Sequence, residues 1–202
     1  MVGSKQPTPV YLSPDEAENH CRAGATVWEF CSTDKGRDPD VVLCGIGVEV
    51  TFEVICAAAL LRQRTPGLRV RVVNVTDLMV LDNESAHPHA LSNEAFDNMF
   101  TQDKPIHFNF HGYPTELQGL LFGRPHVERA TIAGYMEEGT TTTPFDMMLV
   151  NGTSRYHIAK AAIRGAALRN EEIAMRQHEL CAELEFNMKQ VRKHILQNHE
   201  GE

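Results

Sequence analysis

Four consecutive threonines form the most chemically distinctive run in this sequence: Thr140, Thr141, Thr142 and Thr143. Pro144 follows them, and Asp146 lies two residues further on. The Thr143 hydroxyl suits the N-cap of a helix, Pro144 suits its first position, and Asp146 suits its first turn. The same surplus of hydroxyls and free amides could hold an anion such as phosphate. The alternative is a well-capped helix start without a ligand, because every helix start needs partners for its free N–H groups.

A glycine pair, Gly45 and Gly47, lies between a predicted strand and a predicted helix, as in a dinucleotide-binding turn. That pattern needs a third glycine where Val50 stands, and the next candidate acid, Asp77, lies later than the pattern expects. Glu49 would also repel a pyrophosphate from the first turn of the helix. The sequence therefore gives little support for nucleotide binding at this turn.

The ten histidines raise the question of a metal site. His107 and His111 are four residues apart, but the segment is predicted to be extended, with a strand at 106–110, and that spacing is then too long for easy chelation. No cluster of cysteines or carboxylates completes a ligand set, so we expect no metal. His111 is more suggestive because it follows a predicted strand, and open α/β sheets bind ligands at that edge. The alternative is a half-buried histidine that is satisfied within a tight turn.

The composition excludes several classes of partner. The 202 residues carry a formal net charge of −8, which argues against a nucleic-acid or anionic membrane surface. The longest nearly uncharged apolar run, residues 54–61, is too short to span a bilayer, and no signal peptide is expected at the start. The five cysteines are odd in number and lack C-x-x-C spacing, which favours a reducing compartment, the cytoplasm.

Short apolar runs alternate with helical patterns along most of the chain. Five runs are predicted to be strands: residues 26–31, 41–46, 68–75, 106–110 and 127–133. The predicted helices are residues 13–22, 52–64, 92–101, 114–122, 145–151 and 155–168. This alternation is typical of a three-layer α/β domain with a mostly parallel five-stranded sheet. The short turn after residues 26–31 predicts that this strand is an antiparallel edge strand.

The two ends of the chain depart from this alternation. Residues 1–12 are predicted to be an interdomain strap that leads into the domain of residues 13–168, and residues 169–202 are predicted to form one long helix. Apolar side chains form a stripe on that helix: Leu180, Leu184, Met188, Val191 and Ile195. Such a stripe needs a surface to pack on, and either its own domain or a neighbouring chain could supply it.

The threonine run also belongs to an ordered series of longer motifs. They are KQP at 5–7, YLS at 11–13, DVVL at 40–43, VRVVNVTDLM at 70–79, HPHAL at 87–91, FNFHGYP at 108–114 and GYMEEGTTTTPFDMM at 134–148. Together they span most of positions 5–158. In this order they resemble the carboxy-terminal domain of phosphoketolases, whose fold is similar to the carboxy-terminal domain of transketolase.

Phosphoketolases use thiamine diphosphate and Mg²⁺ to cleave xylulose 5-phosphate, and often fructose 6-phosphate, with inorganic phosphate. The products are acetyl phosphate and an aldose phosphate. The resemblance therefore implies an aldehyde-lyase that is a homodimer, with two thiamine-binding domains beside this one in each subunit. The Gly-Asp-Gly…Asn-Asn motif that holds metal and diphosphate is absent from this sequence. We therefore expect this piece alone to bind no cofactor and to be inactive. The alternative is a regulatory or assembly module that binds a phosphorylated effector.

The resemblance implies a role for only a few residues of this sequence. Lys5 matches a family lysine that is implied to hold the sugar phosphate. His111 and the four threonines match family motifs, and we expect them at a ligand site or on the face toward the other domains. No catalytic residue is carried over. Residues 44–49, CGIGVE, differ from the Gly-Asp-Val-Pro-Thr-like pattern common in the family, which puts an effector role of this loop in doubt.

Overall fold

The centre of the molecule is a five-stranded sheet, within a computed structural model that describes residues 8–136 and 142–198. The strands are β1 (Ala25–Val27), β2 (Val41–Ile46), β3 (Val70–Val75), β4 (Ile106–Phe110) and β5 (Ala130–Gly134). Their order across the sheet is β1–β3–β2–β4–β5. All neighbours are parallel except β1, which pairs antiparallel with β3 at one edge. The predicted mostly parallel sheet with one antiparallel edge strand is confirmed.

The middle strand, β2, lies between two hydrophobic cores. All six of its residues are buried, as expected for a parallel strand that is covered on both faces. Val41 and Leu43 contribute to one core, whereas Val42 and Cys44 contribute to the other, because successive side chains of a strand point to opposite faces. The domain therefore has the predicted three layers.

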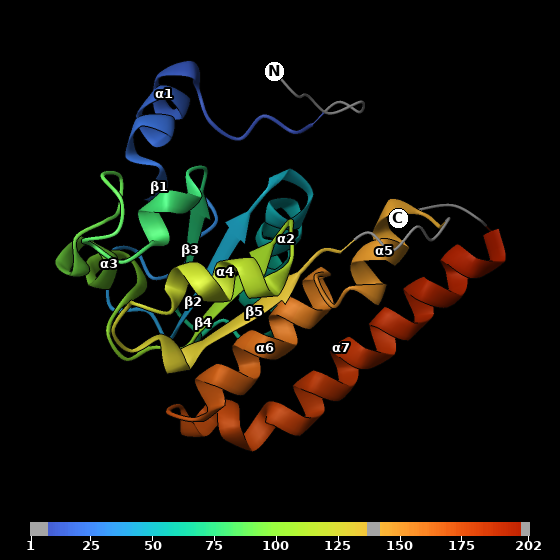
Figure 1. Ribbon diagram of the computed structural model, residues 1–202. Helices are drawn as coiled ribbons and strands as arrows, with labels where there is room; N and C mark the ends of the chain where they lie inside the picture. Colours follow the sequence, from blue (N-terminus) through green and yellow to red (C-terminus); the bar gives the residue numbers. More distant parts are fainter. Residues whose placement is uncertain (1–7, 137–141, 199–202) are drawn as a thin grey trace.

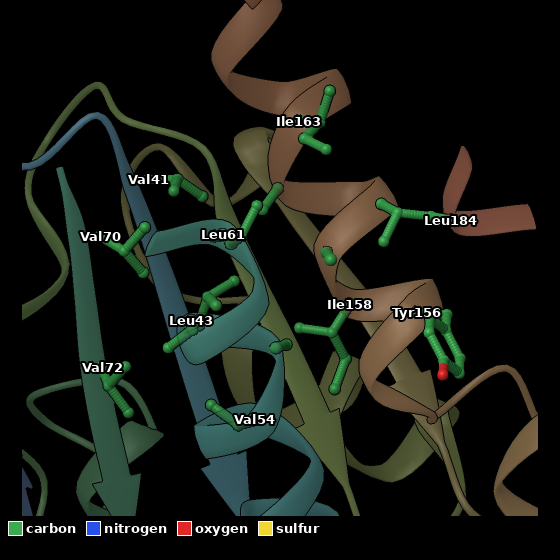
Figure 2. Packing of buried hydrophobic residues seen from close by; sticks show 14 of the residues in the cluster. Val41, Leu43, Val54, Leu61, Val70, Val72, Tyr156, Ile158, Ile163 and Leu184 are labelled. Atoms are coloured by element: carbon green, nitrogen blue, oxygen red, sulfur yellow. The ribbon is translucent and has the colours of Figure 1, made fainter. Parts of the chain in front are cut away.

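Helices α2 (Val48–Arg64) and α6 (Arg155–Ala167) cover the first face. Figure 2 shows Leu61 of α2 and Ile158 of α6 packed with strand residues such as Leu43. The second face is covered by α3 (Asn93–Phe100), α4 (Pro114–Leu121) and the 3₁₀ segment η1 (Leu78–Leu81). A second 3₁₀ segment, η2 (Val127–Arg129), precedes β5.

The C-terminal helix α7 (Glu171–Asn198) runs beside α6 and reaches α5 (Pro144–Val150), as Figure 1 shows. Leu180, Leu184 and Ile195 are buried in the first core, and Met188 and Val191 pack against it. The apolar stripe thus packs on its own domain, which was one of the two predicted possibilities. No helix within the described ranges has the length and apolarity needed to cross a membrane.

The starts of α1 and α3 follow the capping signals of the sequence. Ser13 caps α1 (Pro14–Ala23) with a reciprocal capping box to Glu16, and Gly24 ends the helix at a φ of 71°. Ser92 caps α3 through a bond from the amide of Ala95. These local signals were readable because each joins residues that are three positions apart.

Several predicted bounds are wrong, each for a local reason. Helix α2 begins at Val48 and not at residue 52, because Gly47 accepts a helical bond from Thr51. Strand β1 ends at Val27, since the chain then turns through a bond from Ser32 N–H to Trp28 O. Strand β3 begins at Val70 and β5 at Ala130, where turns precede them.

Candidate functional site at the carboxyl edge of the sheet

The order of the strands reverses direction at β2, which has β3 on one side and β4 on the other. In open α/β sheets, the crevice at the carboxyl ends of the strands around such a switch point is the usual ligand site. Gly47 follows β2 at this point, and His111 follows β4. The backbone N–H of His111 donates to the carbonyl of Ile46 at 2.8 Å, so the two strand ends are held together.

The His111 side chain fills the space in front of the glycine turn. Its Nδ1 lies 2.9 Å from Oε2 of Glu49, and its ring meets the edge of Tyr135 at a centroid distance of 4.8 Å. Gly47 has a φ of +109°, and a Cβ there would clash with the Cβ of His111, so only glycine suits this position. His111 is thus placed at the predicted edge, half-exposed and already paired with a carboxylate.

The glycine turn does not fit a diphosphate. A Cβ at Gly45 would lie 2.7 Å from Thr51 Oγ1, so this glycine serves close packing of α2 on β2. Val50, in the place of the third glycine, is fully buried in the core. Glu49 brings negative charge to the first turn of α2, where a diphosphate would need positive potential. In the ranges that the structure describes, no group of three histidine, cysteine or carboxylate side chains is arranged to hold a metal ion. The described residues around this turn therefore do not fit thiamine diphosphate with Mg²⁺.

A buried polar network beneath this edge was missed from the sequence. Asn74 Nδ2 donates to the Gly45 carbonyl at 2.9 Å and to Thr51 Oγ1 at 3.0 Å, which leaves its Oδ1 to accept from His20 Nε2 at 2.7 Å. His20 Nδ1 then accepts from the Thr26 hydroxyl at 2.6 Å. The network fixes α1, β1 and α2 to the ends of the central strands.

Asn109 of β4, on the other side of β2, also uses its side-chain amide to hold neighbouring segments at the strand ends. It pairs in register with Gly45, as Asn74 does, and its Nδ2 donates to the carbonyls of Val50 and Thr153 at 3.0 Å each. The signal was a single asparagine near the end of each of two apolar strands, β3 and β4. Since an unpaired amide is costly to bury, such an asparagine indicates a specific set of backbone partners.

The end of the threonine run and the start of α5 are held by hydrogen bonds within the protein, a contact that we call the closed joint. The Thr143 side chain accepts from the amide of Asp146 at 3.3 Å, and Pro144 is the first helical residue of α5, so the predicted cap is confirmed. The Asp146 carboxylate accepts from the Thr142 hydroxyl at 2.9 Å and from Arg192 Nε of α7 at 3.0 Å. A carboxylate of the protein therefore already lies at this helix start.

Two parts of the predicted site, the Thr140–Thr141 pair and Lys5, lie outside the described residues. Thr142 and Thr143 follow β5 and precede α5, so the chain order places them beyond the same carboxyl edge as His111. The structure thus brings His111 and the end of the threonine run to one edge of the sheet.

An ion pair between a buried carboxylate and a partly buried guanidinium lies next to this joint and was also missed. Glu53 of α2 accepts from the backbone N–H, Nε and Nη2 of Arg155 at 2.7 to 3.0 Å. The guanidinium lies 4.8 Å from the centroid of the Phe145 ring, a cation–π geometry. The pair therefore connects the starts of α5 and α6 to α2. No local pattern could reveal it, because Glu53 and Arg155 are 102 positions apart.

A cavity of about 430 Å³ lies between the strap and the strand ends. Tyr11 and Pro9 of the strap line it, together with Ile46, Val48 and Phe110. Its polar lining includes His111, Thr51 and Asn74, of which Thr51 and Asn74 take part in the buried network. The size is within the range of small-ligand sites, but the walls are mainly apolar.

Comparison with known proteins gives consistent matches. The XFP C-terminal domain family matches residues 5–202. A probable phosphoketolase of Schizosaccharomyces pombe is 52% identical over 198 residues, which are 98% of this chain and 24% of that protein. A probable phosphoketolase of Mesorhizobium japonicum is 48% identical over 163 residues, or 81% of this chain and 20% of that protein. The chain thus spans a quarter or less of the length of these two relatives.

Among solved structures, one titled "Split gene transketolase, inactive beta4 tetramer" is similar to this chain with a TM-score of 0.50. It is 17% identical, and the match covers 81% of this chain and 48% of that one. At this identity the likeness shows the fold alone, and that fold is the predicted transketolase-like one. With a family match over nearly its whole length, the chain belongs to the XFP C-terminal domain family and is a phosphoketolase C-terminal domain.

Proposed function

We propose that this chain is the carboxy-terminal domain of a thiamine diphosphate-dependent phosphoketolase, an aldehyde-lyase. The full enzyme cleaves xylulose 5-phosphate, with fructose 6-phosphate as a second substrate, and uses inorganic phosphate to form acetyl phosphate and an aldose phosphate. The observation that carries this proposal is the 52% identity to a probable phosphoketolase over 98% of the chain.

Thiamine diphosphate supplies the carbanion chemistry that breaks the carbon–carbon bond in such an enzyme. Because the glycine turn holds Glu49 and His111 where a diphosphate would need space and positive potential, we assign cofactor and Mg²⁺ binding to other domains. The proposed partners are two thiamine-binding domains in the same subunit and a second subunit of a homodimer. The proposed location is the cytoplasm, where the free cysteines of this chain would stay reduced.

Lys5 is the residue that we propose to act on the substrate. Its ammonium group would hold the phosphate of the sugar as a compact positive charge. The alternative, a module that binds a phosphorylated effector, is less well supported. The described starts of α2 and α5 each carry a carboxylate, Glu49 and Asp146, which disfavours a bound phosphate at either helix.

The test is a chimera in which this chain replaces the matching residues of the S. pombe phosphoketolase. We expect the chimera to form acetyl phosphate from xylulose 5-phosphate and phosphate, and the isolated chain to form none. Acetyl phosphate produced by the isolated chain, or a folded chimera without activity, would contradict the proposal.

The role of Lys5 is tested in the same chimera. Lys5→Ala should raise the KM for xylulose 5-phosphate by about tenfold or more, because a charge-assisted contact to phosphate is lost. Lys5→Arg keeps the charge and is the matched control, with a smaller increase expected. An unchanged KM in Lys5→Ala would exclude Lys5 from phosphate binding.

A further inference from the structure

The carboxyl edge carries an exposed apolar surface, which we call the carboxyl-edge patch: the side chains of Val48, Phe52 and Tyr113 together with the mouth of the apolar cavity. The residues Val48, Phe52 and Tyr113 are 47%, 40% and 59% exposed. Val48 and Phe52 share one face of α2, because they are four residues apart. Tyr113 lies two residues after His111. The imidazole of His111 pairs with Glu49, which directly follows Val48, so the segment of Tyr113 is connected to the start of α2.

We propose that the carboxyl-edge patch docks against the part of the phosphoketolase polypeptide that precedes this domain. The inference rests on the proposed function and goes beyond it, because it names the contacting surface. Exposed apolar side chains around an apolar hollow are typical of an interaction site, in which the hollow receives an anchoring side chain of the partner.

The position of the strap identifies the occupant. The family is a C-terminal domain, and this chain spans only 24% of the S. pombe relative, so most of that polypeptide precedes the matching region. In this chain, the described strap residues Thr8, Pro9 and Tyr11 line the cavity of the patch. Figure 1 shows the described part of the strap, residues 8–12, passing the edge of the sheet at which α2 begins. The connection to the preceding domains therefore arrives at the patch itself.

A covalent connection at this place reduces the surface area that docking requires. A tethered partner is present at a high effective concentration, so a few apolar contacts suffice to hold it. The network of Asn74, Thr51 and His20 beneath the patch supports this role, because it fixes the start of α2 to the sheet. Phe122 offers a contrast: it is 86% exposed at the end of α4, which packs on the opposite core.

Hydrogen exchange in the isolated chain and in the S. pombe chimera tests the proposal. Residues 48–53 and 111–114 should exchange at least about tenfold more slowly in the chimera, because docking covers them, while residues 119–123 should keep their rates. Equal rates at residues 48–53 in an active chimera would overturn the docking proposal and leave the proposed function intact. An inactive chimera would count against the proposed function. Protection in the isolated chain that rises with its concentration would show that a second copy covers the patch, which also overturns the proposal.

Two variants add a readout that does not depend on exchange. Val48→Asp places an acid at the first residue of α2, where a helix tolerates it, so the isolated chain should keep its thermal midpoint. In the chimera it should restore fast exchange at residues 111–114, since a charge would be buried in the contact. Phe52→Ser should act in the same direction, and Phe122→Ser is its matched control without effect. Slow exchange at residues 111–114 retained in both patch variants would contradict the assignment.

Discussion

The starts of α5 and α2 lie at the same edge of the sheet, and each holds a carboxylate of the protein. At α5 the acid is Asp146, which is 4% exposed and bonded by Thr142 and Arg192. At α2 the acid is Glu49, whose side chain is 47% exposed and is paired with a half-exposed His111. The same local chemistry thus forms a closed joint at one helix and part of an open surface at the other.

Further buried contacts of α2, β4 and α6 lie next to the closed joint, and we call this part of the molecule the closed side. Glu53 and Arg155 connect α2 to α6, and the buried His107 of β4 lies near His157 of α6. We therefore expect substitutions on this side to lower stability, and substitutions at the open edge to leave the isolated chain nearly unchanged.

The largest effect is expected for Glu53→Ala. It removes a buried carboxylate that accepts three hydrogen bonds from Arg155 at the α2–α6 contact, and breaking a buried pair typically costs about 3–5 kcal/mol. Urea unfolding of the isolated chain measures it. A loss below about 1 kcal/mol, the usual value for an exposed pair, would show that this side is not closed.

The second effect is a dependence of stability on pH. Burial, with a smaller contribution from His157, lowers the pKa of His107 to about 4. The unfolded value is about 6.5, so the folded protein binds this proton more weakly than the unfolded chain. The free energy of unfolding should therefore fall as pH drops from about 6.5 to about 4, by about 3 kcal/mol in all.

The His107→Leu variant tests this assignment by urea unfolding at a series of pH values. It should flatten the curve of unfolding free energy against pH in that window, and His111→Leu at the open edge is the control. The same slope in His107→Leu and in the unaltered chain would assign the effect to other groups.

A smaller loss is expected for Asp146→Ala. The variant removes the acceptor of the Thr142 hydroxyl and of Arg192, and hydrogen bonds to a charged group contribute about 1.5–3 kcal/mol. The unfolding free energy in urea should fall by about that amount. If Arg192→Ala and Asp146→Ala each cause no loss, α7 does not stabilise the start of α5 through this contact.

The smallest effect is expected for Glu49→Ala. Both members of its pair with His111 are exposed, so the loss should stay below about 1 kcal/mol. Thermal unfolding of the isolated chain measures it. A loss as large as that of Asp146→Ala would remove the distinction between the two helix starts.

The sequence predicted what depends on near neighbours along the chain. The cap at Thr143, the apolar strand β2 and the stripe of α7 follow from spacings of a few residues, and the structure confirms them. The start of α2 was misjudged because a glycine without a capping side chain gives no local signal of a helix start.

The rest of the site depends on contacts between distant segments. Asn74 meets His20 across 54 positions, and Glu53 meets Arg155 across 102. Strand β1 pairs with β3 and not with the next strand in sequence, which the short turn after it could not reveal. Such partners become visible only once the topology is fixed.

Acetyl phosphate formation by the S. pombe chimera tests the central claim most directly. If this chain is the C-terminal domain of a phosphoketolase, the chimera should retain the activity of the parent enzyme to within about tenfold, and the isolated chain should have none. A chimera that folds and assembles like the parent but forms no acetyl phosphate would contradict the claim.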